Sequence, residues 1–154
     1  MNLYRPNVAV LVTDGSGRVL LCTRIDETHT QTVQGGIDAG ETPKEAAMRE
    51  LEEEIGLLPF DYEFIGVSDK KYKYDWPPET QERLAATGYI GQEQQYFLIQ
   101  VDSDIDFQLD THEDQEFASV HWGSPAELVA QAWERKQPGL KGSLQEFGLL
   151  SRDA

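Results

Sequence analysis

Three glutamates are spaced so that their carboxylates can act together. Glu50, Glu53 and Glu54 lie three and four positions apart, and this spacing puts side chains on one face of an α-helix. Like charges so close repel each other unless a positive charge lies among them. Mg²⁺ prefers oxygen ligands and also binds substrate phosphates. The spacing therefore favours a magnesium site, although a solvated helix face with ion pairs such as Arg49–Glu53 uses the same residues.

A glycine-rich turn directly precedes these glutamates. Gly35, Gly36 and Gly40 allow the backbone to approach a ligand closely and to adopt positive φ angles. Glu41 follows, and it is placed to brace the turn. An isolated run of charges is usually a solvated surface, but a run behind such a turn favours a binding site.

The helix that carries the glutamates is predicted to span residues 43–55. Thr42 is a good N-cap, Glu45 completes a capping box, and Gly56 ends the helix in a left-handed conformation. An apolar stripe that can pack on a sheet is formed by Ala47, Leu51 and Ile55.

Strands and helices alternate along the rest of the chain. We expect a hairpin of strands at 7–12 and 18–23, an irregular polar segment up to the glycine turn, and strands near 62–77, 94–102 and 118–125. Residues 77–91 read as a polar connection with a helical part near 79–86, and a second helix is expected over 124–136. The tail is weakly patterned. With no repeat or linker, the pattern predicts a single α/β domain over 1–154 with helices on a mixed sheet.

The composition excludes several classes of protein. The chain has 28 acidic and 13 basic side chains and a formal net charge of −15. Nonspecific electrostatic binding of nucleic acid over a broad surface is therefore not expected. Cys22 is the single cysteine, which fits a reducing compartment. No apolar run has the length of a membrane span. We expect a cytoplasmic protein that does not bind membranes.

The segment from Gly35 to Leu57 resembles the signature of the Nudix family of Mg²⁺-dependent pyrophosphohydrolases. Every specified position of that signature is filled, by Gly35, Glu41, Arg49, Glu50, Leu51, Glu53, Glu54, Gly56 and Leu57. The stretches YRPNVAVLV, QGGIDAGE, GQEQQYFLIQ and EFASVHW further resemble bacterial RNA pyrophosphohydrolases and the related dinucleoside tetraphosphate hydrolases. The resemblance implies an α/β/α sandwich with a mixed β-sheet between helices.

The resemblance also implies the metal ligands. They are Glu50, Glu53, Glu54, Glu116 and the backbone carbonyl of Gly35, around Mg²⁺, for which Mn²⁺ can substitute. Glu53 is the leading candidate for the base that activates water, with Glu54 and Glu116 as rivals. Glu116 also fits an ordinary acid in an acidic run. Arg49 is expected to orient the glutamates and, like Glu41, to support the motif without touching substrate.

The same resemblance suggests substrate-binding residues. Arg5 and Arg24 are expected to contact phosphates, because the guanidinium fork suits phosphate oxygens. Gln92 and Gln94 can contact a base or phosphate, or can face solvent. Lys70 and Tyr72 belong to the stretch KKYKYDW, which suits base stacking beside phosphates or an ordinary exposed strand edge. The basic-aromatic pair on the last helix of the RNA-processing relatives has no clear counterpart, although AWERK at 132–136 is a candidate.

Three functions follow from these expectations. The first is removal of pyrophosphate or phosphate from the 5′-triphosphate end of RNA. The second is hydrolysis of a dinucleoside polyphosphate such as diadenosine tetraphosphate. Hydrolysis of other nucleoside-diphosphate-linked substrates is the third. A noncatalytic nucleotide-binding module on the same fold is an alternative of a different class, and the complete glutamate motif argues against it. A homodimer is compatible with each of them.

Overall fold

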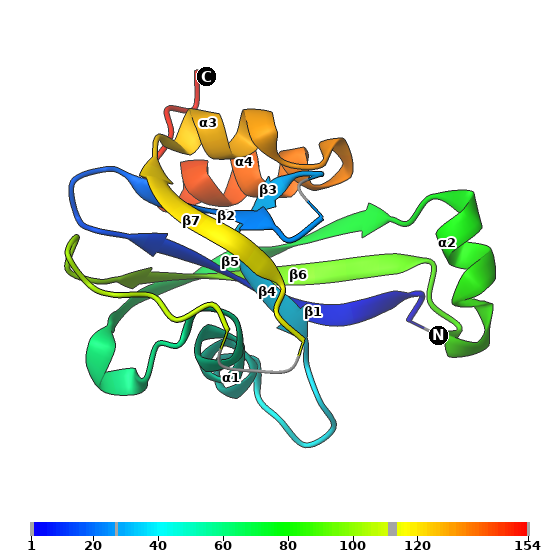
Figure 1. The fold of residues 1–154 in the computed structure, drawn as a ribbon. Helices are drawn as coiled ribbons and strands as arrows, with labels where there is room; N and C mark the ends of the chain where they lie inside the picture. Colours follow the sequence, from blue (N-terminus) through cyan, green and yellow to red (C-terminus); the bar gives the residue numbers. More distant parts are fainter. Residues whose placement is uncertain (1, 27, 111–113, 154) are drawn as a thin grey trace.

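The structure is a computed structural model that describes residues 2–26, 28–110 and 114–153 (Figure 1). Its strands are β1 (Tyr4–Thr13), β2 (Val19–Arg24), β3 (Thr30–Gln31), β4 (Val33–Gly36), β5 (Glu63–Asp75), β6 (Gly91–Gln100) and β7 (Phe117–Gly123). They form one sheet of order β3-β2-β1-β6-β5, in which β4 also pairs with β1 and β7 with β2. The β1–β6 pair is parallel and the other pairs are antiparallel, so the predicted mixed sheet is confirmed.

Helices cover both faces of this sheet (Figure 1). These are α1 (Pro43–Ile55) on one face and α3 (Pro125–Gln131) and α4 (Gln137–Glu146) on the other, whereas the short helix α2 (Pro78–Arg83) lies at the end of β5 and β6. Short 3₁₀ turns lie at Pro59–Asp61, Ala85–Thr87 and Glu134–Lys136. No helix of the described residues is both long and apolar enough to span a membrane.

The central strand β1 divides its side chains between two hydrophobic cores. Val8 and Val10 join the core under α1, whereas Ala9 and Leu11 join the core under α3 and α4. This alternation is the period of two that a strand imposes. It places α1 on one face of the sheet and α3 and α4 on the other, which confirms the α/β/α sandwich.

Helix α1 has the ends that its sequence predicts. The Thr42 hydroxyl accepts a hydrogen bond from Glu45 N at 3.1 Å, and Glu45 Oε1 accepts one from Thr42 N at 2.9 Å. Gly56 caps the other end at φ 73°. Leu51 and Ile55 are fully buried against the sheet, and each buried side chain of this size contributes about 1.5–3 kcal/mol. This packing fixes the rotation of α1 and hence the direction of its glutamates.

The C-terminal third differs from the prediction. The helix expected over 124–136 ends at Gln131, and a second helix, α4, occupies the weakly patterned segment that follows. The residue after α3, Ala132, has an extended backbone with ψ 157°. Helix α4 contains a proline and two glycines, which weaken a helix, but Leu140 and Leu144 are buried against the sheet. Tertiary burial therefore forms this helix where local propensity does not.

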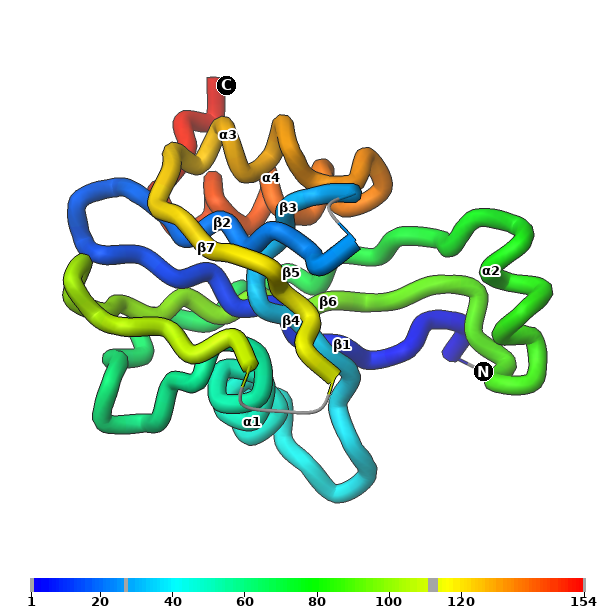
Figure 2. Tube along the Cα trace, in the orientation of Figure 1, coloured from blue at the N-terminus to red at the C-terminus, as the bar shows by residue number. Residues whose placement is uncertain are grey.

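Two other segments also differ in detail. The polar segment before the glycine turn, predicted to be irregular, contains β3 and β4, and β4 pairs with β1. The predicted helical part near 79–86 is the short helix α2 followed by a 3₁₀ turn. Figure 2 shows that α2 lies at the far end of β5 and β6, beside the N-terminus. There the Tyr4 hydroxyl donates a hydrogen bond to Asp75 at 2.7 Å.

Candidate active site

The glutamates of α1 lie against β4, the strand that ends in the glycine turn. Gly35 makes this contact possible, because a Cβ atom at its position would lie 2.1 Å from Glu50 Oε1. Glu50 and Glu54 are consequently only 8% and 5% exposed. Glu53, one helical step away, keeps 39% of its side chain exposed. The predicted cluster therefore has two buried members and one that faces solvent.

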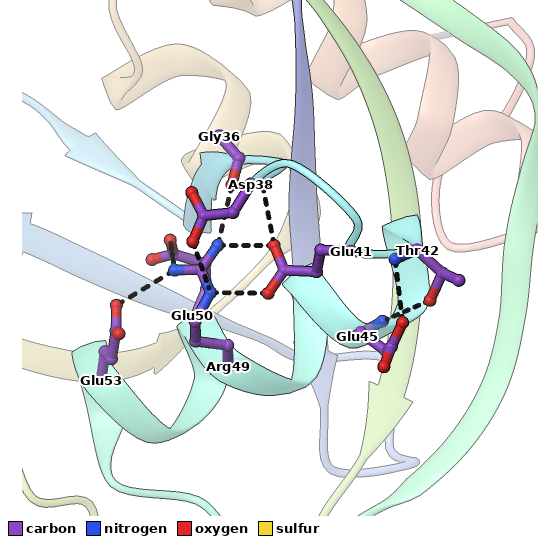
Figure 3. Close-up of polar contacts among 8 residues, drawn as sticks. All are labelled: Gly36, Asp38, Glu41, Thr42, Glu45, Arg49, Glu50 and Glu53. Carbon is purple, nitrogen blue, oxygen red and sulfur yellow. Dashed lines mark hydrogen bonds and ion pairs between the residues drawn. The ribbon is translucent and has the colours of Figure 1, made fainter.

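Arg49 links the glycine turn to the helix (Figure 3). Its guanidinium donates to both carboxylate oxygens of Glu41, at 2.8 and 2.9 Å, and to the carbonyl of Gly36 at 2.9 Å. It also donates to Glu50 at 2.7 Å and to Glu53 at 3.3 Å. The hydrogen bonds from Arg49 lower the pKa of Glu41 to about 2, so this pair stays ionised. Arg49 therefore contacts the glycine turn and two of the three clustered glutamates.

The two buried glutamates are in a strained electrostatic environment. Burial, and then the negative charge of Glu116, raise the pKa of Glu54 well above its usual value. Burial likewise raises the pKa of Glu50, although Arg49 opposes the shift. Glu54 Oε2 accepts a hydrogen bond from Gln34 N at 3.1 Å, whereas Glu54 Oε1 is buried without a hydrogen-bond partner. A positive charge placed beside these carboxylates would lower the free energy of keeping them ionised.

A cavity of about 620 Å³ opens over these carboxylates. It brings together seven of the predicted site residues, which are Arg5, Gly35, Glu50, Glu53, Glu54, Gln92 and Glu116. Four further lining residues were not predicted, namely Asn7, Gln34, Gly36 and Asp114. Three of these four stand within the stretches YRPNVAVLV and QGGIDAGE, so those stretches held the signal for them. The cavity thus combines clustered carboxylates with one arginine and several amides.

The residues of this cavity fit a divalent metal in their chemistry. Hard cations take carboxylate and carbonyl oxygens, and the unpartnered Glu54 Oε1 offers such an oxygen. Among the described residues, however, no three acidic, histidine or cysteine side chains are already grouped as a metal site. Arg49 engages both Glu50 and Glu53. An ion would therefore compete with Arg49 for the oxygens of those two residues.

Arg5 supplies the positive charge that faces into the cavity. Its Nη2 would lie 2.1 Å from a Cβ atom on Gly36, so the glycine leaves the space that the guanidinium occupies. Arg5 lines the cavity together with the α1 glutamates. The position suits contact with an anionic group that enters beside the carboxylates.

A second cavity, of about 250 Å³, adjoins the first through an ion pair. Arg24 lines it, and Arg24 Nη1 lies 3.4 Å from Glu116 Oε1, an atom of the first cavity's lining. Lys136 and Trp133 form another wall. Burial, and then the charge of Arg24, lower the pKa of Lys136 to about 8. The Trp133 ring packs edge-on against Tyr74, with centroids 5.8 Å apart. The segment AWERK, named from the sequence as a candidate, thus brings a cation and an aromatic ring to this cavity, although Lys136 was not singled out within it.

Three of the predicted substrate-binding residues lie elsewhere. Gln94 is 2% exposed and is held by hydrogen bonds inside the sheet. Lys70 and Tyr72 line a third cavity, of about 430 Å³, with Glu146 and Arg152. The structure does not bring these three residues to the glutamates. In the stretch KKYKYDW it is Tyr74 that contacts the wall of the second cavity.

Comparison with known proteins assigns this site to a family. The family model described as the NUDIX domain matches residues 3–142. The RNA pyrophosphohydrolase of Francisella tularensis subsp. mediasiatica is 41% identical over 122 residues, which cover 79% of this chain and 78% of that protein. Nudix hydrolase 25 of Arabidopsis thaliana is 35% identical over 158 residues, which cover 97% and 89% respectively.

Solved structures of low sequence identity share the fold. The dihydroneopterin triphosphate pyrophosphohydrolase of E. coli superposes with a TM-score of 0.70 at 19% identity, over 92% of this chain and 97% of that chain. A C. elegans Ap4A hydrolase binary complex superposes with a TM-score of 0.63 at 15% identity, over 94% and 98%.

Proposed function

The chain belongs to the Nudix family and is a hydrolase of phosphoanhydride bonds, and on this premise we propose that it removes pyrophosphate or phosphate from the 5′-triphosphate end of RNA with Mg²⁺. The observation that carries the choice of substrate is the pair of adjoining cavities. The first combines carboxylates with Arg5, and the second combines Arg24 and Lys136 with Trp133. A 5′-phosphorylated oligonucleotide has phosphates for the first and a nucleotide for the second.

The net charge of the chain supports a contact confined to the RNA end. With a formal net charge of −15, the surface as a whole repels a polyanion. The cations that line the two cavities, Arg5, Arg24 and Lys136, are therefore the ones that hold the substrate. We expect little contribution from nucleotides beyond the first few.

The residues of the first cavity divide the chemistry among them. Glu50, Glu54, Glu116 and the Gly35 carbonyl would hold the metal, which neutralises phosphate oxygens and positions the attacking water when it is bound. Arg5 binds and orients the phosphates. Glu53 is the most exposed of the three clustered glutamates, and it accepts the water proton on Oε1, since its Oε2 faces Arg49.

Hydrolysis of a dinucleoside polyphosphate is the second candidate. The ring of Trp133, which lines the second cavity and packs against Tyr74, also suits the second base of such a substrate. An Ap4A hydrolase is among the proteins that share the fold.

Product analysis separates the two candidates. A short 5′-triphosphate RNA and diadenosine tetraphosphate are incubated with the enzyme and Mg²⁺ at equal concentration. Faster conversion of the RNA to its 5′-monophosphate supports the proposal, whereas preference for the dinucleotide overturns it in favour of the second candidate. Hydrolysis of neither substrate supports a nucleotide-binding module.

We predict that Lys136→Met weakens binding of the RNA. The change removes a buried cation and keeps an unbranched chain of similar length, so we expect KM for 5′-triphosphate RNA to rise about tenfold, as for one charged hydrogen bond. Thermal stability should hold or increase, because a desolvated ammonium is replaced by an apolar group. The matched control is Lys141→Met, which removes an exposed lysine of α4 and should leave KM unchanged.

The pKa of Lys136 gives this prediction a pH dependence. Because the pKa of Lys136 is lowered to about 8 in the folded protein, its positive charge is present below pH 8 and is lost as the pH rises through 8. KM of the wild type should therefore rise across this range, and that of Lys136→Met should not follow. Equal pH profiles for the two proteins would contradict the assignment.

A further inference from the structure

A chain of hydrogen-bonded side-chain amides runs through the sheet at the wall of the first cavity. Asn7 on β1 and Gln94 on β6 are only 3% and 2% exposed. Gln94 Nε2 donates to Asn7 Oδ1 at 2.9 Å and to Gln34 Oε1 at 3.0 Å. Asn7 Nδ2 donates to Gln92 Oε1 at 2.7 Å. The four amides thus join β1, β4 and β6 in one hydrogen-bonded network.

The network ends at both cavities. At one end, the backbone N–H of Gln34 donates to Glu54 Oε2 at 3.1 Å. At the other, Gln92 Nε2 donates to the Tyr74 hydroxyl at 2.6 Å, and Tyr74 packs against Trp133 of the second cavity. Asn7 lies between these ends, with its oxygen and its nitrogen both engaged.

We propose that Asn7 is a positioning residue for the reaction, which sets the orientation of the Gln92 carboxamide toward the substrate. The proposal rests on the proposed function. A carboxamide has a donor nitrogen and an acceptor oxygen, and a 180° rotation of the group exchanges their positions. Because Asn7 Nδ2 holds Gln92 Oε1, Gln92 directs Nε2 outward. One Nε2 hydrogen reaches Tyr74, and the other is available to an acceptor in the cavity, such as a phosphate or base oxygen.

Without Asn7, nothing would oppose the reversed carboxamide. Gln92 would then present Oε1 to an anionic substrate, which has acceptors in excess and would be repelled. Asn7 itself has no need to touch the substrate. Its effect should therefore pass through Gln92 and appear in substrate binding more than in the chemical step.

A double-mutant cycle of Asn7→Leu and Gln92→Leu tests this route. The cycle measures KM and kcat for the better of the two substrates, and the dissociation constant of a methylene-bridged nucleoside triphosphate that is not cleaved. We expect Asn7→Leu to raise KM and the dissociation constant about tenfold, the loss typical of one hydrogen bond, with kcat within about threefold. The double variant should bind no more weakly than Gln92→Leu alone, because coupled residues are not additive.

The control is Gln95→Leu, on the same strand, whose amide contacts the Ser68 carbonyl outside the network; it should leave KM unchanged. Should Asn7→Leu unfold below the assay temperature, Asn7→Asp keeps the shape and loses the donor to Gln92, and it should raise KM similarly. The proposal would be overturned if the effects of the two substitutions on KM multiplied in the double variant, or if Asn7→Leu left KM unchanged. If the wild type cleaves neither substrate, the proposed function fails, and the dissociation constants still decide the role of Asn7.

Discussion

Glu53→Gln should abolish most of the hydrolytic activity while leaving the fold intact. The substitution keeps the shape of the side chain and its acceptor toward Arg49, but an amide cannot take a proton from water. Loss of a general base typically lowers kcat by about 10²–10⁴-fold. We expect a decrease of this size, measured as single-turnover cleavage at saturating Mg²⁺, with a melting temperature close to that of the wild type.

Glu52→Gln is the matched control for this experiment. Glu52 is exposed on the same helix and does not line the first cavity, so its variant should retain wild-type kcat. Raising the Mg²⁺ concentration separates two roles of Glu53. A lost metal ligand is partly compensated by more metal, whereas a lost base is not. If kcat of Glu53→Gln stayed within threefold of the wild type, Glu54 or Glu116 would be the base instead.

Arg49→Met should destabilise the protein strongly in the absence of divalent metal. Arg49 is 27% exposed and makes ion pairs with Glu41, Glu50 and Glu53. Its removal leaves Glu50 buried beside Glu54 without a cation, and breaking such a network typically costs about 3–5 kcal/mol. Urea unfolding at equilibrium measures this loss directly. Lys44→Met removes another cation of α1, one that stacks on Phe64, and should cost less than about 1 kcal/mol.

Added Mg²⁺ should restore part of that stability. An ion that binds only the folded state stabilises it in proportion to its occupancy, and in Arg49→Met it meets no competing guanidinium. The increase in melting temperature on addition of Mg²⁺ should therefore be larger for this variant than for the wild type. Equal increases would show that Arg49 and the metal do not share the same oxygens.

The sequence predicts the site best where the signals are local. The ends of α1 follow from Thr42, Glu45 and Gly56, whose effects reach no further than one helical turn. The shared face of Glu50, Glu53 and Glu54 follows from helical spacing alone. The mixed sheet with helices packed on it was likewise predicted from the alternation of elements, whereas the α/β/α sandwich was implied by the resemblance to the Nudix family.

The parts that were missed depend on contacts between distant segments. Helix α4 forms because Leu140 and Leu144 are buried, which its proline and glycines do not reveal. In the stretch KKYKYDW, Tyr72 and Tyr74 stand opposite Gln94 and Gln92 of β6 and share one face of β5. Spacing alone therefore could not show that Tyr74, and not Tyr72, would pack against Trp133 of the second cavity. The position of Lys136 in the second cavity was hidden for the same reason, since Arg24, Thr30 and Gln31, which line that cavity with it, lie on β2 and β3.

The parallel pairing of β1 with β6 has a consequence for synthesis on the ribosome. Tyr4 pairs with Gly91 and Thr13 with Gln100, so the first strand cannot gain this neighbour until well over half of the chain has been made. Pairings between such distant residues slow folding. A nascent chain that already contains α1 still lacks Gln92 and Glu116. Its acidic helix therefore exists before the residues that complete the cavity around it have been synthesised.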